Sequence, residues 1–198
     1  MCVRVHSLTL YGSNDRVATK LSIGELVTSS DYRFCPRCSG RLARKLLKAG
    51  DPERLVCEEC EFVFFLDPKV AAGTIFAVDG KIILARRAIE PAYGKWVFPG
   101  GFVDRGETIE AAALRETREE VNVEVELAEL INAYSYEHTP VVVLVYAARV
   151  IGGEPEAADE CLEVRGYEPG KIPWDDLAFT STRDALRDYI RRYVCPKR

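Results

Sequence analysis

The spacing of apolar positions along this chain predicts strands over much of its length. Residues 70–78 are almost continuously apolar, which is typical of a strand buried on both faces. Asp79-Gly80 follows directly and is a strong hairpin signal, so residues 81–87 are expected to pair back as a second strand. Further strand-like patterns, the second of them rich in β-branched residues, cover residues 125–134, 141–151 and 162–167.

Two segments have helical character instead. Residues 107–121 contain no Gly or Pro and are rich in Ala, Glu and Arg, so a helix is expected to begin near Thr108. Residues 181–194 have an amphipathic pattern that predicts a closing helix. Strands and helices in this order predict an α/β fold, in which a mixed sheet is flanked by two helices.

Four cysteines in the first third of the chain have the spacing of a metal site. Cys35 and Cys38 form one CxxC pair, Cys57 and Cys60 form another, and eighteen residues separate the pairs. Each pair makes a tight turn that aims two thiolates at one ion, so together they would complete a tetrahedron around Zn²⁺. Four thiolates leave no open position, and the zinc is therefore expected to be structural. The alternatives are two disulfides or reduced cysteines in a small core.

The segment around these cysteines, residues 33–66, is predicted to be a small zinc ribbon with strands at 54–57 and 62–66. A lobe of this size buries little core, so the metal should supply its folding energy. Basic residues flank the first cysteine pair. We interpret them as a solvated face rather than as a nucleic-acid contact; they are Arg37, Arg41, Arg44, Lys45 and Lys48.

Composition is that of an ordinary globular chain, with 198 residues, 47% of them hydrophobic and 29% charged. We divide it into an N-terminal arm (1–32), the ribbon (33–66) and a main domain (67–198). The net charge of −4 argues against a large nucleic-acid surface. No apolar run approaches the roughly 18 residues of a membrane span.

The cysteines and the N-terminal arm also bear on the compartment. An odd total of seven cysteines, four of them in close pairs, suits a reducing compartment, and a cytoplasmic protein is expected. Organelle import is the alternative, because Arg4, Arg16 and Lys20 lie among several Ser and Thr residues. Asp15 and Glu25 weaken that interpretation.

The first predicted helix carries the candidate chemistry. Glu116, Glu119 and Glu120 fall on one face, where three like charges repel one another. A hard divalent cation would relieve the repulsion, because carboxylate oxygens are the ligands it prefers. Arg115 lies one turn before Glu119 and can pair with it. The Gly100-Gly101 pair before the helix lets backbone approach a ligand. The alternative is an ordinary solvated helix face.

The order of these residues resembles the signature sequence of the Nudix hydrolases. Gly101, five residues, Glu107, seven residues and then Arg-Glu-x-x-Glu-Glu reproduce its pattern. Thr117 stands where an aliphatic residue is usual, and Asn122 stands where Gly usually ends the helix. Asn is the second choice for a left-handed residue after a helix, so the turn should survive. With the ribbon before it and the segment 172–179 after it, the chain is similar to the zinc-ribbon Nudix group, which includes the NADH pyrophosphatases and the ADP-ribose/FAD pyrophosphatases.

This resemblance implies an α/β/α sandwich and a pyrophosphatase that uses Mg²⁺ or Mn²⁺ to cleave ADP-ribose, FAD or NADH into two monophosphates. It implies that Glu116, Glu119, Glu120 and the backbone carbonyl of Gly100 bind the metal, with Arg115 and Glu107 orienting the carboxylates. A general base often lies outside the signature in related enzymes. The candidates for it are Glu160 and Glu163, each of which is otherwise a surface acid.

Substrate contacts are less well defined by the sequence. Arg86 and Arg87 are candidates for binding phosphates, and Phe76 and Tyr134 are candidates for stacking on an adenine or flavin ring. The ordinary alternatives are solvated arginines and core aromatic residues. The family resemblance also leads us to expect a homodimer and a nucleotide substrate, with no membrane and no RNA partner.

Two other functions remain open at this stage. One is removal of the NAD cap from RNA, because that cap contains the same diphosphate linkage. The other is a catalytically silent nucleotide sensor or RNA-binding adaptor. The complete set of acidic residues in the signature argues against a silent protein.

Overall fold

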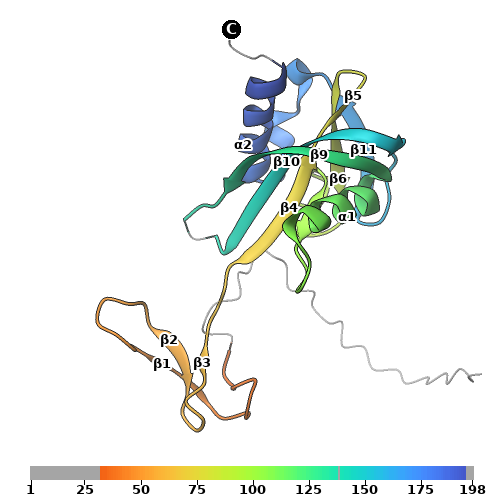
Figure 1. Ribbon diagram of the computed structural model, residues 1–198. Helices are drawn as coiled ribbons and strands as arrows, with labels where there is room; N and C mark the ends of the chain where they lie inside the picture. The colour runs from red at the N-terminus through yellow and green to blue at the C-terminus, as the bar shows by residue number, and fades with distance from the viewer. Residues whose placement is uncertain (1–31, 138, 195–198) are drawn as a thin grey trace, which may run out of the picture.

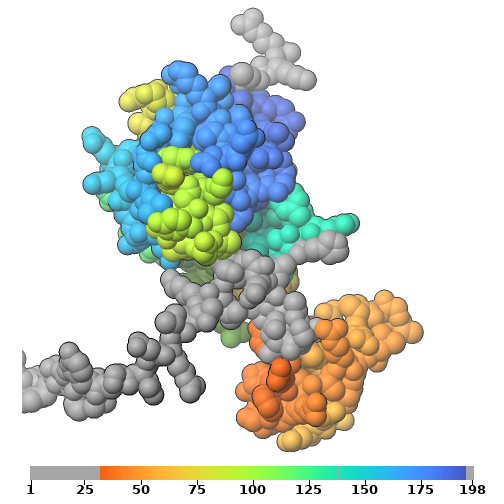
Figure 2. Space-filling view, turned by 180° about the vertical axis from the view of Figure 1, so that it is seen from behind, coloured from red at the N-terminus to blue at the C-terminus, as the bar shows by residue number. Residues whose placement is uncertain are grey.

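The computed structural model describes residues 32–137 and 139–194. The predicted arm, apart from Tyr32, lies outside these residues. The described chain forms a small lobe and a larger domain, and both are visible in Figure 1 and, from behind, in Figure 2. The lobe is a three-stranded antiparallel sheet made of β1 (Leu42–Lys45), β2 (Arg54–Cys57) and β3 (Val63–Phe64). Both predicted ribbon strands are present, whereas β1 lies within the segment interpreted only as a basic flank.

The larger domain contains two four-stranded sheets. The first has the order β8 (Gly100–Phe102), β4 (Lys69–Ile75), β10 (Val141–Gly153) and β9 (Val123–Tyr134). It is mixed, because β10 runs parallel to β4 and antiparallel to β9. The second has the order β11 (Cys161–Tyr167), β6 (Lys81–Arg87) and β5 (Ala77–Val78), with β7 (Trp96–Val97) also paired to β6. The predicted α/β class with a mixed sheet is confirmed.

The predicted strand over residues 70–78 is interrupted at Phe76. β4 ends at Ile75 and β5 begins at Ala77, so the apolar run passes from the first sheet to the second. The hairpin that follows is as predicted. Asp79 and Gly80 have φ values of 50° and 73°, which is the left-handed backbone that a two-residue type I′ turn requires.

Both faces of β6 are covered. Ile82 and Leu84 pack into a core that includes Ala185 and Leu186 of α2 (Thr180–Tyr189). The alternate residues Ile83 and Ala85 pack against Val121, at the end of α1 (Ile109–Val121). Figure 1 shows the two helices on opposite sides of the sheets. The predicted closing helix extends past α2 as a π-helical segment, Ile190–Val194, and short 3₁₀ turns at Pro169–Lys171 and Trp174–Asp176 precede it. None of the helices in the described part of the chain has the length and apolar character of a membrane span.

Helix α1 begins and ends where the sequence predicts. The Thr108 hydroxyl accepts a hydrogen bond from the Ala111 N–H at 3.1 Å, which caps the N-terminus. Asn122 ends the helix with φ of 57°, in the left-handed conformation expected of it. The unusual Thr117 is fully buried, where its hydroxyl lies 2.7 Å from the Thr74 hydroxyl of β4 and donates to the Ala113 carbonyl at 2.7 Å. A polar contact therefore joins the helix to the sheet at a position where the family usually has an aliphatic one.

Candidate active site

The loop before α1 brings backbone against the helix carboxylates. The Gly100 N–H donates to Glu120 Oε2 at 2.8 Å. A Cβ atom at Gly101 would lie 2.5 Å from the Glu116 carboxyl group, and one at Gly100 would lie 2.6 Å from the Gly73 Cα atom. A larger residue at Gly100 would collide with the backbone of β4, whereas one at Gly101 would force the Glu116 carboxyl group to move, so the glycine pair leaves room for this carboxylate in its present place.

Arg115 joins three carboxylates. Its Nε and Nη2 atoms donate to the two oxygens of Glu107, both at 2.9 Å, and Nη2 also donates to the Phe102 carbonyl at 3.1 Å. Its Nη1 atom donates to Glu116 Oε1 at 2.7 Å and to Glu119 Oε2 at 3.1 Å. The bidentate bond from Arg115 holds the pKa of Glu107 below its ordinary value. Glu107 therefore holds the guanidinium group in place, and the guanidinium in turn orients Glu116 and Glu119.

The three helix glutamates differ in their exposure to solvent. Glu120 is only 9% exposed, and burial raises the pKa of its carboxyl group from 4.5 to about 7, against the lowering effect of the Gly100 N–H. Burial also raises the pKa of Glu116, with Arg115 opposing the shift. The Glu119 side chain remains 41% exposed. Crowded and partly desolvated oxygens of this kind fit a hard divalent cation.

The two candidate bases lie in different environments. Residues 156–160 are attached to the end of α1, because the Ala158 N–H donates to the Glu120 carbonyl at 3.1 Å. The charge of Glu160 makes a small contribution to the raised pKa values of Glu116 and Glu120, so this carboxylate lies within electrostatic reach of both. Glu163 instead pairs with Arg165 and, at 3.8 Å, with Arg86. Of the two candidates, Glu163 is therefore engaged by two arginines, whereas Glu160 interacts electrostatically with the helix glutamates.

The two candidate arginines, Arg86 and Arg87, also have different surroundings. Arg87 donates to the Pro91 carbonyl at 2.9 Å and lies 5.2 Å from the centre of the Phe179 ring. Burial lowers the pKa of its guanidinium, and the charges of Glu120 and Glu160 oppose that shift, so Arg87 lies within electrostatic reach of these carboxylates. Arg86 donates to the Gly94 carbonyl at 2.8 Å and otherwise faces Glu163 and the Trp96 ring.

Two predicted aromatic contacts do not lie on the site surface. Phe76 is 0% exposed and packs with Val121 and Val123, so its ring has no surface for a substrate. Tyr134 is 7% exposed, belongs to the core beside α2 and donates its hydroxyl to Asp188 at 2.9 Å. Both are core residues here, which corrects their assignment as stacking residues. The Phe102 carbonyl contact to Arg115 was missed, because a backbone acceptor leaves no signal in the sequence.

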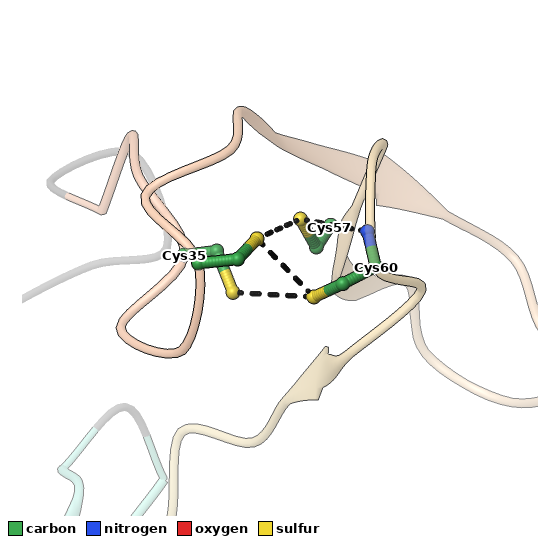
Figure 3. A group of neighbouring side chains, drawn as sticks. Cys35, Cys57 and Cys60 are labelled. Atoms are coloured by element: carbon green, nitrogen blue, oxygen red, sulfur yellow. Dashed lines mark hydrogen bonds between the residues drawn. The ribbon is translucent and has the colours of Figure 1, made fainter.

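The four lobe cysteines converge as predicted. Their sulfur atoms all lie within 4.8 Å of one another, with separations of 3.3 Å (Cys38–Cys60), 3.4 Å (Cys38–Cys57) and 3.8 Å (Cys35–Cys60). Figure 3 shows the thiols of both pairs pointing into one space. Ligands about 2.3 Å from a tetrahedral zinc are about 3.8 Å apart. A disulfide needs sulfurs about 2.05 Å apart, so the geometry fits a metal and not disulfides.

Comparison with known families gives two adjoining matches. Residues 66–193 match the model of the NUDIX domain, and residues 33–65 match the model named Nudix N-terminal, a zinc ribbon. A solved NUDIX hydrolase from Nitrosomonas europaea superposes with a TM-score of 0.78 at 34% identity, covering 84% of this chain and 94% of that one.

Two curated relatives indicate the range of activities among similar proteins. An ADP-ribose pyrophosphatase from Methanocaldococcus jannaschii is 33% identical over 155 residues, which is 76% of this chain and 86% of the relative. An NAD-capped RNA hydrolase from Pseudomonas aeruginosa is 32% identical over 124 residues, which is 62% of this chain but only 42% of the relative. The match therefore spans less than half of the RNA hydrolase.

Proposed function

The chain belongs to the Nudix hydrolase family, and on that basis we propose that it is a divalent-metal-dependent pyrophosphatase that cleaves ADP-ribose into two monophosphates. The observation that carries the proposal is the cluster of Glu116, Glu119 and Glu120 beside the Gly100 backbone, with Arg115 fixed by Glu107. ADP-ribose is favoured over FAD and NADH because the ADP-ribose pyrophosphatase is matched over most of its length.

We assign each residue of the site one role in the reaction. Glu116, Glu119, Glu120 and the Gly100 carbonyl would hold Mg²⁺ or Mn²⁺, which when bound neutralises charge on the phosphate oxygens and activates water. Arg115 keeps Glu116 and Glu119 in place, so that the carboxylates do not have to be ordered when the substrate arrives. Glu160 accepts a proton from the attacking water, and Arg87 binds the substrate phosphates. The P–O bond of the diphosphate breaks as the new P–O bond to water forms.

Further assignments accompany the proposal. Zn²⁺ in the four-cysteine cluster would stabilise the lobe, since the lobe core consists of little beyond the cysteines, Leu42 and Leu55. Thiolate ligands of this kind persist in a reducing compartment, which favours a cytoplasmic protein over organelle import. The family resemblance supports a homodimer, which light scattering would test.

Removal of the NAD cap from RNA is the second candidate function. It is supported by the similarity to NAD-capped RNA hydrolases and by the shared diphosphate chemistry. It ranks second because the match covers only 42% of the Pseudomonas aeruginosa enzyme, against 86% of the ADP-ribose pyrophosphatase. A silent sensor is disfavoured, because the helix carboxylates, Arg115 and the glycine loop remain joined in one hydrogen-bonded cluster, which a protein without turnover would not need.

The test is a hydrolysis screen of ADP-ribose, FAD, NADH and NAD-capped RNA, with Mg²⁺ and with Mn²⁺, in which chromatography resolves the products. Wild type is compared with Glu119→Gln and with Glu110→Gln. Glu110 lies on the same helix but in its first turn, where it accepts a hydrogen bond from Tyr146. It therefore controls for charge removal away from the cluster.

We expect ADP-ribose to be cleaved fastest, with activity lost in Glu119→Gln and retained in Glu110→Gln. Preferred cleavage of capped RNA would favour the second candidate. Turnover that is unchanged in Glu119→Gln would show that the catalytic assignment is wrong.

A further inference from the structure

The lobe contains a cavity that the pyrophosphatase chemistry does not use. Its volume is about 500 Å³, and it lies over β1 and the chain that precedes it. The floor is formed by Leu42 and Leu55, which are buried in the lobe core. The walls are two aromatic and three arginine side chains: Tyr32, Phe34, Arg33, Arg41 and Arg44.

One wall offers an open aromatic face. Phe34 is 67% exposed although it forms a β-bridge with Arg41, which fixes its backbone beside an arginine. Tyr32 packs against Phe64 with 4.8 Å between ring centres, so a second ring is held at the rim. Exposing a phenylalanine to this extent gains nothing for the fold. The ring is placed where a flat apolar ligand group can stack on it.

The charges around the cavity have one sign. Among residues 32–137 and 139–194, no carboxylate lines it, and the acidic residues of the lobe lie elsewhere, at Asp51, Glu53, Glu58, Glu59 and Glu61. Residues 33–65 carry seven basic and five acidic side chains, whereas residues 66–198 carry 17 basic and 23 acidic ones. The lobe is therefore the part of the molecule that attracts a polyanion.

Basic side chains next to an exposed aromatic ring suit a chain of phosphates and bases. Arginines contact the phosphates, and a base stacks on the ring. A duplex does not fit this arrangement, because its bases are already stacked on one another. Arg41 and Arg44, which were interpreted from sequence as part of a solvated face, here surround a cavity. We propose that this cavity binds single-stranded nucleic acid, with one base stacked on Phe34 and adjacent phosphates on Arg33 and Arg41.

The test measures binding of a short, fluorescently labelled single-stranded RNA to the full chain by anisotropy, with the matching duplex and inorganic polyphosphate as competitors. The RNA has a 5′-hydroxyl end and no diphosphate, so binding is independent of the proposed hydrolysis. Wild type is compared with Phe34→Ala, Phe34→Trp and Arg41→Ala. Phe65→Ala removes another exposed lobe phenylalanine, and Lys48→Ala removes another lobe charge; neither residue lines the cavity.

We expect Phe34→Ala to weaken the affinity by roughly fivefold or more, the lower end of a stacking contribution, and Phe34→Trp to restore it. Arg41→Ala should also reduce the slope of log affinity against log salt by about 0.7, as for the loss of one phosphate contact. Both control variants should bind as wild type does. Zinc content and ADP-ribose hydrolysis should be unchanged in all variants, which shows that the lobe is folded.

Three results would overturn the proposal. One is an absence of RNA binding by a protein that retains its zinc. Another is an equal loss of binding in Phe65→Ala and Lys48→Ala, which would indicate diffuse charge attraction. The third is competition by polyphosphate or duplex as strong as by single strands, with no effect of Phe34→Ala, which would indicate an anion site without base recognition.

Discussion

Replacing Glu120 by Gln should stabilise the metal-free protein at alkaline pH. Glu120 is buried, and the pKa of its carboxyl group is raised from 4.5 to about 7. The folded protein therefore binds this proton more tightly than the unfolded chain does. The resulting stability is fully present below about pH 4.5, and it is lost as the pH rises through 7. A difference of about 2.5 units corresponds to about 3 kcal/mol.

The Gln side chain keeps the shape of Glu and an oxygen that can accept the Gly100 N–H, but it cannot ionise. We expect the free energy of unfolding of Glu120→Gln to match that of wild type near pH 4.5. At pH 8 it should exceed the wild-type value by about 3 kcal/mol. Glu119→Gln is the matched control, because Glu119 is largely exposed and its neutralisation should change the stability little.

Urea unfolding followed by tryptophan fluorescence is a suitable assay. The two tryptophans, Trp96 and Trp174, both lie in the larger domain, so the signal does not report on the zinc lobe. Adding Mg²⁺ should abolish the advantage of the variant, because the cation stabilises the ionised wild-type site. If the difference in the free energy of unfolding between wild type and Glu120→Gln is the same at pH 5 and at pH 8, the argument from burial is wrong.

Two further predictions follow from the contacts around α1. Glu160→Gln should lower kcat by roughly 100-fold or more, the range for loss of a general base, whereas Glu163→Gln should leave kcat almost unchanged because Glu163 pairs with Arg86 and Arg165. Steady-state kinetics with ADP-ribose measure kcat for both variants. An equal decrease in kcat would contradict the assignment of Glu160, rather than Glu163, as the general base. Thr117→Val should cost about 1–3 kcal/mol in urea unfolding, because it leaves the buried Thr74 hydroxyl without this partner. The double variant Thr74→Val/Thr117→Val should regain much of that loss, and a purely additive result would contradict the role of the hydroxyl pair.

The features that were predicted correctly from the sequence depend mostly on residues that are close together in the chain. Thr108 and Asn122 fix the two ends of α1 by capping, and the spacing of Arg115 and Glu119 fixes their contact on one helix face. These features depend on residues a few positions apart. Each CxxC turn is local in the same way, and the convergence of the two pairs, 19 to 25 positions apart, was predicted from the known spacing of zinc ribbons.

The predictions that were wrong or undecided depend on tertiary pairing. The break at Phe76 has no local signal, because the residues on both sides of it are apolar although they belong to different sheets. Glu160 and Glu163 cannot be ranked from sequence, because the partners that distinguish them come from distant parts of the chain; Glu163 pairs with Arg86 of β6, whereas the charge of Glu160 acts on the glutamates of α1. The bridge between Arg41 and Phe34 likewise has no local signal, although Arg41 itself is exposed, as a solvated basic face predicts.

The charges at the site explain why cation and substrate binding should be coupled. Five carboxylates meet there and only two guanidinium groups accompany them; these residues are Glu107, Glu116, Glu119, Glu120 and Glu160, with Arg115 and Arg87. The raised pKa of Glu120 is one consequence of this excess, since taking up a proton relieves it. Divalent cations relieve it more completely and leave positive charge for the diphosphate of a substrate. If these carboxylates bind the cations as proposed, the same substitution, Glu120→Gln, should both stabilise the metal-free protein at pH 8 and lower its affinity for Mg²⁺.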